Sequence, residues 1–393
     1  MSVESSDDGS DPADDGLNLF TGEPQHENFA RMSEFFPTSL LLPSPEPHVF
    51  PVGPALFLPE TYEFDGTDRA SADFLADTDT AALLVLHNGV TRFEQYWLTG
   101  GPDVQWISWS VAKSFVSALI GIAVDEGHIG SIEDAVSSYV PELAGSAYDG
   151  VSIRSVLQMS SGASWNEDYS DPDSDVARLG AVISGSGSLL DFVSGMTREQ
   201  EPGTFCRYNS ADTQVLGHLL IAATGRTITD YMQEKLSTPL GMESPGCWML
   251  DGDGVEMAFA GLNLTARDYA KLGELFRLGG RWHGQQLVPA DWVAGSTASD
   301  EPHMQEGEIM VGEEVFPFGY AYQWWIPSGK TGAFTAIGIY NQFVFVDPVS
   351  GATVVKLSAN RTYGLSPYEA DDREGETAAF IRAVIAELDT AVG

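Results

Sequence analysis

The sequence predicts an α+β fold in which one antiparallel sheet is assembled from distant segments and a mainly helical subdomain is inserted between them. Strand patterns occur early, at Ala81–His87 and Val90–Trp97, where they flank an Asn-Gly turn signal. Strand patterns return only late in the chain, at Phe316–Trp325, Phe334–Ile339, Gln342–Val346 and Ala352–Leu357. The long stretch between the two groups has mainly helical periodicity. Strands at both ends and helices between them indicate this plan.

Helical patterns fill the middle of the chain, and an amphipathic helix follows the last strand. The predicted helices are Ile132–Tyr139, Ile153–Met159, Gly187–Thr197, Ser210–Thr224, Ala266–Leu278 and Gly375–Val392. We therefore expect four parts: an acidic, disordered N-terminus (1–25), a segment that wraps the domain (26–74), a sheet subdomain (75–126 and 301–393) and an inserted helical subdomain (127–300).

The chain is strongly acidic, with 19 basic and 57 acidic residues among 393 and a net charge of −38. Only five residues are lysine. Such a charge repels nucleic acid and anionic lipid, so neither is an expected partner. An acidic, lysine-poor surface is typical of adaptation to high salt, where self-repulsion is screened. The alternative is a protein that is acidic without being halophilic.

Several classes of protein lack support in the sequence. The N-terminus shows no secretory signal and no run has the length of a membrane span, so we expect a cytoplasmic protein. The two cysteines form no disulfide framework, and the seven histidines show no metal-type spacing. No nucleotide-binding motif is present, so no cofactor and no metal is predicted. The oligomeric state is not predicted.

The stretch from Trp106 to Glu126 predicts a buried helix entered through a serine-rich turn. Ser110 and Lys113 form an S-x-x-K pattern near its N-terminal end. Residues three apart on a helix lie one turn above each other, so the hydroxyl and the amine can touch. A serine needs an adjacent base to become a nucleophile, and a buried lysine can lose its charge and serve as that base. By itself the pattern is also compatible with chance.

Further blocks follow the S-x-x-K pattern in a recognisable order. The blocks are SWSVAKSFVSALIG, LQMSSGASWNEDYSDPDSD, PGTFCRYNSADTQVLGHLL, GYAYQWW and AIGIYNQFVFVDP, and the matched region extends over about residues 75 to 390. Together they resemble the serine hydrolases of the penicillin-recognising, β-lactamase-like superfamily, and most closely its class C-like esterase and 6-aminohexanoate-dimer hydrolase branch. The resemblance implies the β-lactamase/penicillin-binding-protein-like α+β fold.

The resemblance also implies roles for residues of the helical subdomain. Tyr208, in the YNS block, matches the family tyrosine that exchanges protons with the nucleophile, and Ser210 would point into the cleft. A phenol is a poor base unless a nearby cation lowers its pKa, and Lys113 would be that cation. Taken alone, Tyr208 is more typical of a core tyrosine that caps the loop before the helix Ser210–Thr224.

A strand lining the site is expected from the last block. Gly338 and Ile339 match the family strand, so the backbone N–H groups of Ile339 and Ser110 would form an oxyanion hole. Asn341 stands where the branch more often has glycine. A literal KTG at Lys330–Gly332 matches the superfamily box but is also typical of a hairpin turn. The sequence leaves open which of the two lines the site.

Two further features have both a functional and a structural interpretation. Tyr169 matches a substrate-contacting tyrosine of the branch, but it lies among acidic residues typical of a solvated loop: Glu167, Asp168, Asp171 and Asp173. The aromatic block Tyr320, Tyr322, Trp324 and Trp325 would line a cleft on one face and pack on the other. Cys206 is compatible with a buried neighbour of the site and with an ordinary core thiol.

The sequence therefore predicts a serine hydrolase that cleaves a small-molecule ester or amide through an acyl-enzyme on Ser110, with Lys113 and Tyr208 as proton shuttle. A β-lactamase or D-alanyl-D-alanine peptidase is the alternative within the same chemistry. A non-catalytic binding protein on the same fold is the alternative of another class. The residues do not specify the acyl or leaving group.

Overall fold

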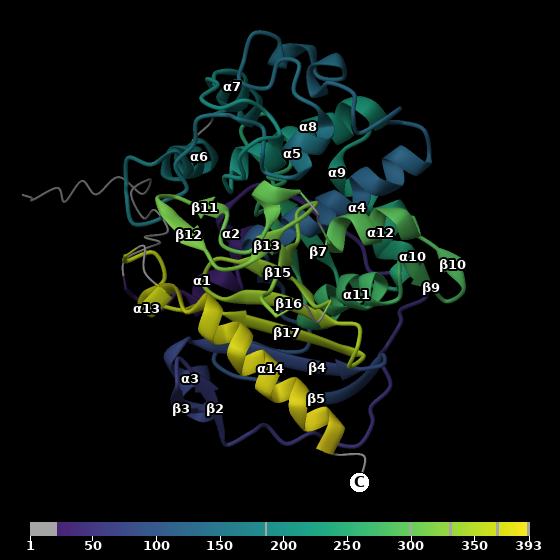
Figure 1. Cartoon of the computed structure of the whole chain (residues 1–393). Coiled ribbons are helices and arrows are strands. Elements are labelled where there is room, and N and C mark those ends of the chain that lie inside the picture. The colour runs from purple at the N-terminus through teal and green to yellow at the C-terminus, as the bar shows by residue number, and fades with distance from the viewer. Residues whose placement is uncertain (1–21, 185–186, 299–300, 330–331, 367–368, 391–393) are drawn as a thin grey trace, which may run out of the picture.

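The computed structural model describes residues 22–184, 187–298, 301–329, 332–366 and 369–390. The predicted α+β plan is confirmed, with a seven-stranded antiparallel sheet at its base (Figure 1). In spatial order the strands are β13 (Gly319–Tyr320), β14 (Trp325–Ile326), β15 (Phe334–Gly338), β16 (Gln342–Asp347), β17 (Ala352–Ser358), β4 (Thr80–His87) and β5 (Val90–Tyr96). The pairing of β17 with β4 joins segments from opposite ends of the chain.

Helices cover both faces of this sheet, α14 (Glu374–Thr390) on one and α11 (Ala266–Arg277) on the other. Successive strand residues point to opposite faces. Leu83 of β4 accordingly belongs to the apolar cluster that contains α14, and Leu84 belongs to the cluster that contains α11. A strand buried on both faces has a continuous apolar sequence, as β4 does.

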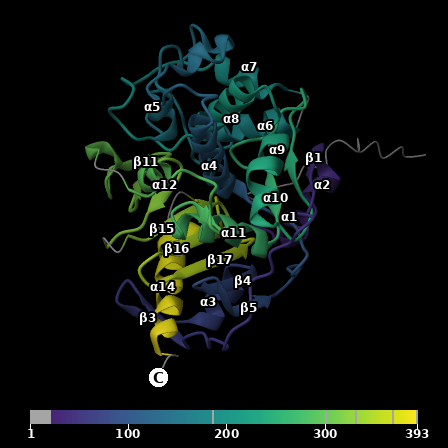
Figure 2. The same ribbon diagram turned by 90° about the vertical axis from the view of Figure 1, so that its right-hand side faces the viewer.

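The helical half of the molecule lies beyond the α11 face of the sheet (Figure 2). Its elements are α4 (Ala112–Asp125), α5 (Ile153–Leu157), α6 (Asp175–Ser184), α7 (Leu189–Ser194), α8 (Ser210–Thr224), α9 (Ile228–Met232), α10 (Thr238–Leu240) and α12 (Ala290–Thr297). At its centre, α4 packs against α8 and is buried along its length from Ala112 to Ala123. In the part of the chain that the structure describes, no helix is both long and apolar enough to cross a bilayer.

A second, four-stranded sheet connects the N-terminal segment to the helical half. Its order is β1 (Thr38–Leu41), β7 (Gly246–Met249), β8 (Leu262–Leu264) and β6 (Trp106–Ile107). The remaining elements are short: α1 (His26–Phe29), α2 (Met32–Phe35), β2 (Thr61–Phe64), β3 (Thr67–Ala70), α3 (Ser71–Asp77), β9 (Arg281–Trp282), β10 (Gln285–Gln286), β11 (Ile309–Val311), β12 (Glu314–Phe316) and α13 (Glu369–Asp372).

Two sequence-based assignments are wrong. The predicted helix Ile132–Tyr139 is a turn followed by one 3₁₀ turn at Val136–Ser138. The predicted strand Phe316–Trp325 is divided among β12, β13 and β14, because the chain reverses between β13 and β14. At that reversal Gln323 has a left-handed φ of 63°, and the Ala321 N–H donates to the Trp324 carbonyl at 3.0 Å. Apolar alternation does not reveal a reversal within a run of aromatic residues.

The four-part domain organisation remains a prediction, and the packing of α11 bears on it. This helix lies within the predicted inserted subdomain, 127–300, yet it packs against β16, β17 and β4 of the main sheet. The predicted insertion therefore includes one helix of the sheet layer. The predicted disordered N-terminus falls largely outside the described residues.

The N-terminal segment contributes to the main core through Phe29 of α1. Phe29 is fully buried. Its ring makes edge contacts with Trp106 at 5.9 Å, Trp109 at 5.4 Å and Tyr340 at 4.8 Å between ring centroids. Aromatic pairs of this geometry stabilise beyond the area that they bury. Phe29 therefore supports two different segments, the one that contains Trp109 and the turn that contains Tyr340.

Three of the five lysines have buried side chains. Lys113 is 1% exposed, and Lys271 and Lys356 are fully buried. The Lys271 ammonium is paired with Asp268 and Glu243. Lys356 donates to hydroxyl groups of neighbouring residues instead, and burial lowers its pKa well below the usual value. Lysine is rarely buried without such partners.

The burial of Phe29 predicts a large loss of stability in Phe29→Ala. Truncating a buried phenylalanine leaves a cavity, so the free energy of unfolding should fall by about 3–5 kcal/mol. Denaturant unfolding measures this change. Phe57→Ala is the matched control, because Phe57 lies in the same segment but is 84% exposed. It should change stability by less than about 0.5 kcal/mol. Equal effects of the two substitutions would contradict a core role for Phe29.

Candidate active site

Ser110 lies in a 3₁₀ turn, Trp109–Val111, that connects β6 to α4. The helix predicted from Trp106 thus begins later, because Trp106 and Ile107 pair with β8. Trp109 has a left-handed φ of 45°, which costs an L-residue with a side chain of order 1 kcal/mol. The strand before it and the buried helix after it hold this conformation. The sharp turn places Ser110 beside a small cavity.

Lys113 lies one helical turn after Ser110, and its amine is held by three oxygen atoms. The Nζ donates to Ser110 Oγ at 2.9 Å, to Ser210 Oγ at 3.0 Å and to the Phe259 carbonyl at 3.0 Å. Burial lowers the pKa of Lys113 to about 7, and the carboxylate of Glu167 opposes this shift. Near neutral pH the amine is therefore present in both charged and neutral forms, and the neutral form can accept a proton.

Tyr208 directly precedes the Asn209 that caps α8, and it reaches the same pair from the helical half. Tyr208 and Ser110 line the same small cavity, and the Tyr208 ring centroid lies 5.1 Å from Lys113 Nζ. The expectation that Lys113 lowers the pKa of this phenol is wrong. Burial, and after it the Glu167 carboxylate, raise the pKa of Tyr208 well above the ordinary value. The phenol is therefore a proton donor at neutral pH.

Glu167 is a site residue that the sequence did not indicate. It is 1% exposed, so the alternative of a solvated acidic loop is wrong for this residue. Its carboxylate accepts from Ser210 Oγ at 2.5 Å, from Ser210 N at 3.0 Å and from Tyr169 OH at 2.6 Å. Trp165 Nε1 is a further donor. The alternation Trp165-x-Glu167-x-Tyr169, which puts the three side chains on one face of an extended segment, was the available signal.

Gly338 ends β15 directly against the turn that carries Ser110. A Cβ atom at Gly338 would lie 2.5 Å from the Ser108 carbonyl oxygen and 3.0 Å from the Ser110 nitrogen. Both are backbone atoms that cannot move aside cheaply, so only glycine allows this approach. Ile339 follows in the turn and lines the cavity beside Ser110. Lys330 and Thr331 of the KTG sequence lie outside the described residues, so their position remains untested.

The departure at Asn341 is accommodated by the backbone. Tyr340 and Asn341 both adopt left-handed φ values, 64° and 66°, in the turn between β15 and β16. Asparagine tolerates this conformation better than other residues with side chains. In addition, Asn341 Nδ2 donates to the Asp372 carbonyl at 2.7 Å, a contact that glycine cannot make. This hydrogen bond connects the turn to the end of α13.

Comparisons with known proteins identify the family of this chain. The family model described as beta-lactamase matches residues 68–379, which is more than half of the chain. The chain belongs to the beta-lactamase family of serine hydrolases. A 6-aminohexanoate-dimer hydrolase of Paenarthrobacter ureafaciens is 32% identical over 342 residues, 84% of each chain.

Two solved structures show a similar fold. A Bacillus anthracis protein, provisionally assigned as a 6-aminohexanoate-dimer hydrolase, superposes with a TM-score of 0.78 at 24% identity and covers 95% of this chain and 96% of that one. A family VIII carboxylesterase superposes with a TM-score of 0.59 at 16% identity, covering 81% of this chain and 95% of that one. At these identities the likeness establishes the fold only.

In this beta-lactamase family member, the cavity beside Ser110 is small, and half of its lining residues are aromatic. Its volume is about 20 Å³, and it is lined by Ser110, Tyr169, Tyr208, Val311, Phe316, Trp325, Ile337, Ile339, Tyr363 and Glu374. Of the predicted aromatic block, Trp325 lines it and stacks on Tyr208 at 5.1 Å. The other three block residues are buried packing residues. Cys206 is also buried, which raises the pKa of its thiol well above the usual value and makes it unreactive.

An acidic cavity of about 180 Å³ adjoins the first one and shares Tyr169, Val311, Phe316, Tyr363 and Glu374 with it. Its acidic lining residues are Glu167, Asp168, Glu313, Glu314, Glu369, Asp372 and Glu374, and none of its described lining residues is basic. Burial and neighbouring carboxyls raise the pKa of Asp372 to about 7 and that of Glu374 well above the usual value. A cation in this cavity would favour their ionised forms.

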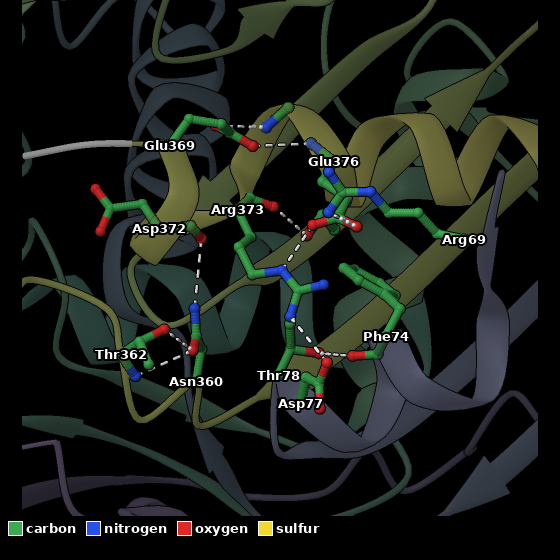
Figure 3. Close-up of polar contacts among 12 residues, drawn as sticks. Arg69, Phe74, Asp77, Thr78, Asn360, Thr362, Glu369, Asp372, Arg373 and Glu376 are labelled. Carbon is green, nitrogen blue, oxygen red and sulfur yellow. Dashed lines mark hydrogen bonds and ion pairs between the residues drawn. The ribbon is translucent and has the colours of Figure 1, made fainter. Parts of the chain in front are cut away.

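The wall of the acidic cavity is anchored at the junction of α13 and α14 (Figure 3). Glu369 accepts from the backbone N–H groups of Gly375 and Glu376 at 3.0 and 2.9 Å. Arg373, at a left-handed φ of 56°, donates to Glu376 at 2.6 Å and lies 3.7 Å from Asp77. These contacts fix the start of α14, where Glu374 is located. Among the described residues no group of three potential ligands could hold a metal ion.

Proposed function

We propose that this protein hydrolyses an ester or amide bond through a covalent acyl-enzyme on Ser110. The observation that carries the proposal is the Lys113 amine, which lies 2.9 Å from Ser110 Oγ in a buried environment that lowers its pKa to about 7. A base within hydrogen-bonding reach and with a pKa near the working pH is what activation of a serine requires.

The proposed first half-reaction transfers the acyl group to the enzyme. Neutral Lys113 takes the Ser110 proton while Oγ forms a bond to the substrate carbonyl carbon. The backbone N–H groups of Ser110 and Ile339 stabilise the negative charge that develops on the carbonyl oxygen. Tyr208, whose phenol remains protonated, donates a proton to the leaving alcohol or amine as its bond to carbon breaks. The proton held by Lys113 then restores Tyr208.

The proposed second half-reaction releases the acid. Water attacks the acyl carbon, one water proton passes to the Lys113–Tyr208 pair, and Ser110 leaves carrying a proton. The same groups therefore act in reverse order, and the enzyme returns to its starting state.

The acidic cavity supports a substrate class for this reaction. A substrate that carries a cationic amine a few bonds from its scissile carbonyl would place the amine near Asp372 and Glu374 when the carbonyl is at Ser110. The cation would supply the counter-charge that these crowded carboxyls lack. We therefore propose linear esters or amides with a terminal amine as substrates. A β-lactam would bring a carboxylate toward the same acidic wall, so we expect it to be a poorer substrate.

The nucleophile is tested by Ser110→Ala. Turnover of a p-nitrophenyl ester and labelling by a fluorophosphonate should both be abolished, because each requires the Ser110 oxygen to form a covalent bond with the reagent. Assays at low and molar salt should be run in parallel, because a protein adapted to high salt would be active only when its acidic surface is screened. Labelling that survives the substitution would place the nucleophile elsewhere. Absence of both turnover and labelling in the wild type at every salt concentration would favour a non-catalytic role.

The pH dependence follows from the Lys113 amine. The base acts only when neutral, so kcat/KM should rise with pH through a midpoint near 7, the pKa that burial gives Lys113. Between pH 6 and pH 8 the increase should be about tenfold, the change in the neutral fraction of such a base. No fall is expected up to about pH 9, because Tyr208 stays protonated. A neutral ester serves as substrate. A profile that is flat from pH 5 to 8 would contradict the role of Lys113.

The substrate class is tested by Asp372→Asn. The asparagine keeps the acceptor for the Gly364 N–H, which lies 3.1 Å from Asp372 Oδ1. Two esters of equal length, one with a terminal amine and one with a neutral end, are compared in each variant. The kcat/KM ratio of amine to neutral ester should fall about tenfold, the value of one nearby charge at a partly buried site. An unchanged ratio would remove this carboxyl from substrate recognition.

A further inference from the structure

The buried carboxylate of Glu167 is connected to the Lys113 amine through a single hydroxyl group. Lys113 Nζ and Glu167 Oε1 are bridged by one hydroxyl group, Ser210 Oγ, which lies 3.0 Å from the amine and 2.5 Å from the carboxylate oxygen. All three side chains are almost completely buried. In such an environment charges interact more strongly than in water.

The bridge has a defined direction. A carboxylate cannot donate, so the single Ser210 hydroxyl proton points at Glu167, and the Ser210 oxygen is left to accept from Lys113. The remaining donors to the carboxylate are Ser210 N, Tyr169 OH and Trp165 Nε1. These donors come from two separate segments and fix the position of the carboxylate. The carboxylate therefore lies one hydroxyl group away from the amine, where its charge opposes the lowering of the Lys113 pKa by burial.

Other ionisable groups near Lys113 do not provide this charge. On the α8 side, Asp212 accepts from Ser161 and Tyr148, and burial raises its pKa to about 7. At the start of α14, Glu374 has a pKa raised well above the usual value and accepts from Tyr363. The remaining neighbours of the amine are neutral: the hydroxyls of Ser110 and Ser210, the Phe259 carbonyl and the Tyr208 ring.

We propose that Glu167 is a positioning residue for Lys113: through Ser210 it orients the amine and supplies the buried negative charge that balances the lysine whenever it carries a proton. The inference rests on the proposed function and extends it. Burial alone would make the amine a weaker base than the reaction needs. Glu167 offsets part of this effect, so that Lys113 can accept the Ser110 proton as Oγ attacks and hold it until the leaving group departs.

The test is the kcat/KM–pH profile of Glu167→Gln with a neutral ester. Removing the charge should move the midpoint of the rising limb to lower pH by about one unit and lower the plateau about tenfold or more, because a less basic amine is a poorer proton acceptor. Glu256→Gln is the matched control. Glu256 is also 1% exposed and accepts two hydrogen bonds from Thr229, but it neither contacts Lys113 nor lines either cavity. Its midpoint should equal that of the wild type.

A second measurement separates this proposal from the proposed function, because it needs no turnover. In protein labelled with ¹³C-lysine, the Lys113 Cε signal, assigned by its loss in Lys113→Met, should titrate near pH 7 in the wild type and at lower pH in Glu167→Gln. If Glu167→Gln does not fold, Ser210→Ala breaks the bridge, and its signal should shift in the same direction. An unchanged Lys113 titration in the folded variant, or an equal shift in Glu256→Gln, would overturn the proposal. Loss of turnover in the wild type with an intact titration shift would refute the proposed function alone.

Discussion

The burial of the Lys113 amine is the constraint on which the site depends. Taking a lysine out of water disfavours its charged form, so a buried amine needs hydrogen-bond acceptors and a nearby negative charge. Three oxygen atoms receive its donors, and a carboxylate lies beyond one of them. The result is an amine that is neither permanently charged nor permanently neutral. A solvent-exposed lysine at the same helical spacing from a serine would hold its proton and could not act as a base.

The fold meets this constraint by bringing four separate segments to the start of α4. The turn after β6 delivers Ser110, and β15 closes against it at Gly338. The loop before α8 delivers Tyr208, and α1 packs Phe29 behind the turn. None of these segments is a neighbour of another in sequence. The strained conformation of Trp109 persists because both of its flanking segments are fixed. Packing of these segments thus fixes the positions of the reactive groups.

The sequence predicted most of the regular fold, because long elements carry strong patterns. Strand β4, helix α8 and helix α14 were found almost to the residue, and Ser110, Lys113 and Tyr208 were identified as one group from spacing and resemblance. Short elements were missed: β6 has two residues, too few for a pattern. Glu167 was missed for a different reason. A glutamate among aspartates is typical of a solvated loop, and the weak alternation of Trp165, Glu167 and Tyr169 does not show that both aromatic side chains donate to the carboxylate, as they do in the structure.

The burial of lysines in the core has a practical consequence for handling the protein. Lys113, Lys271 and Lys356 have no exposed amine, Lys330 lies outside the described residues, and Lys235 is tied to Glu126 and Glu234. Reagents that react with primary amines, such as succinimidyl esters or glutaraldehyde, therefore have few surface targets on this chain. Cross-linking or immobilisation through carboxyl groups, which are abundant on its exterior, is the better matched chemistry.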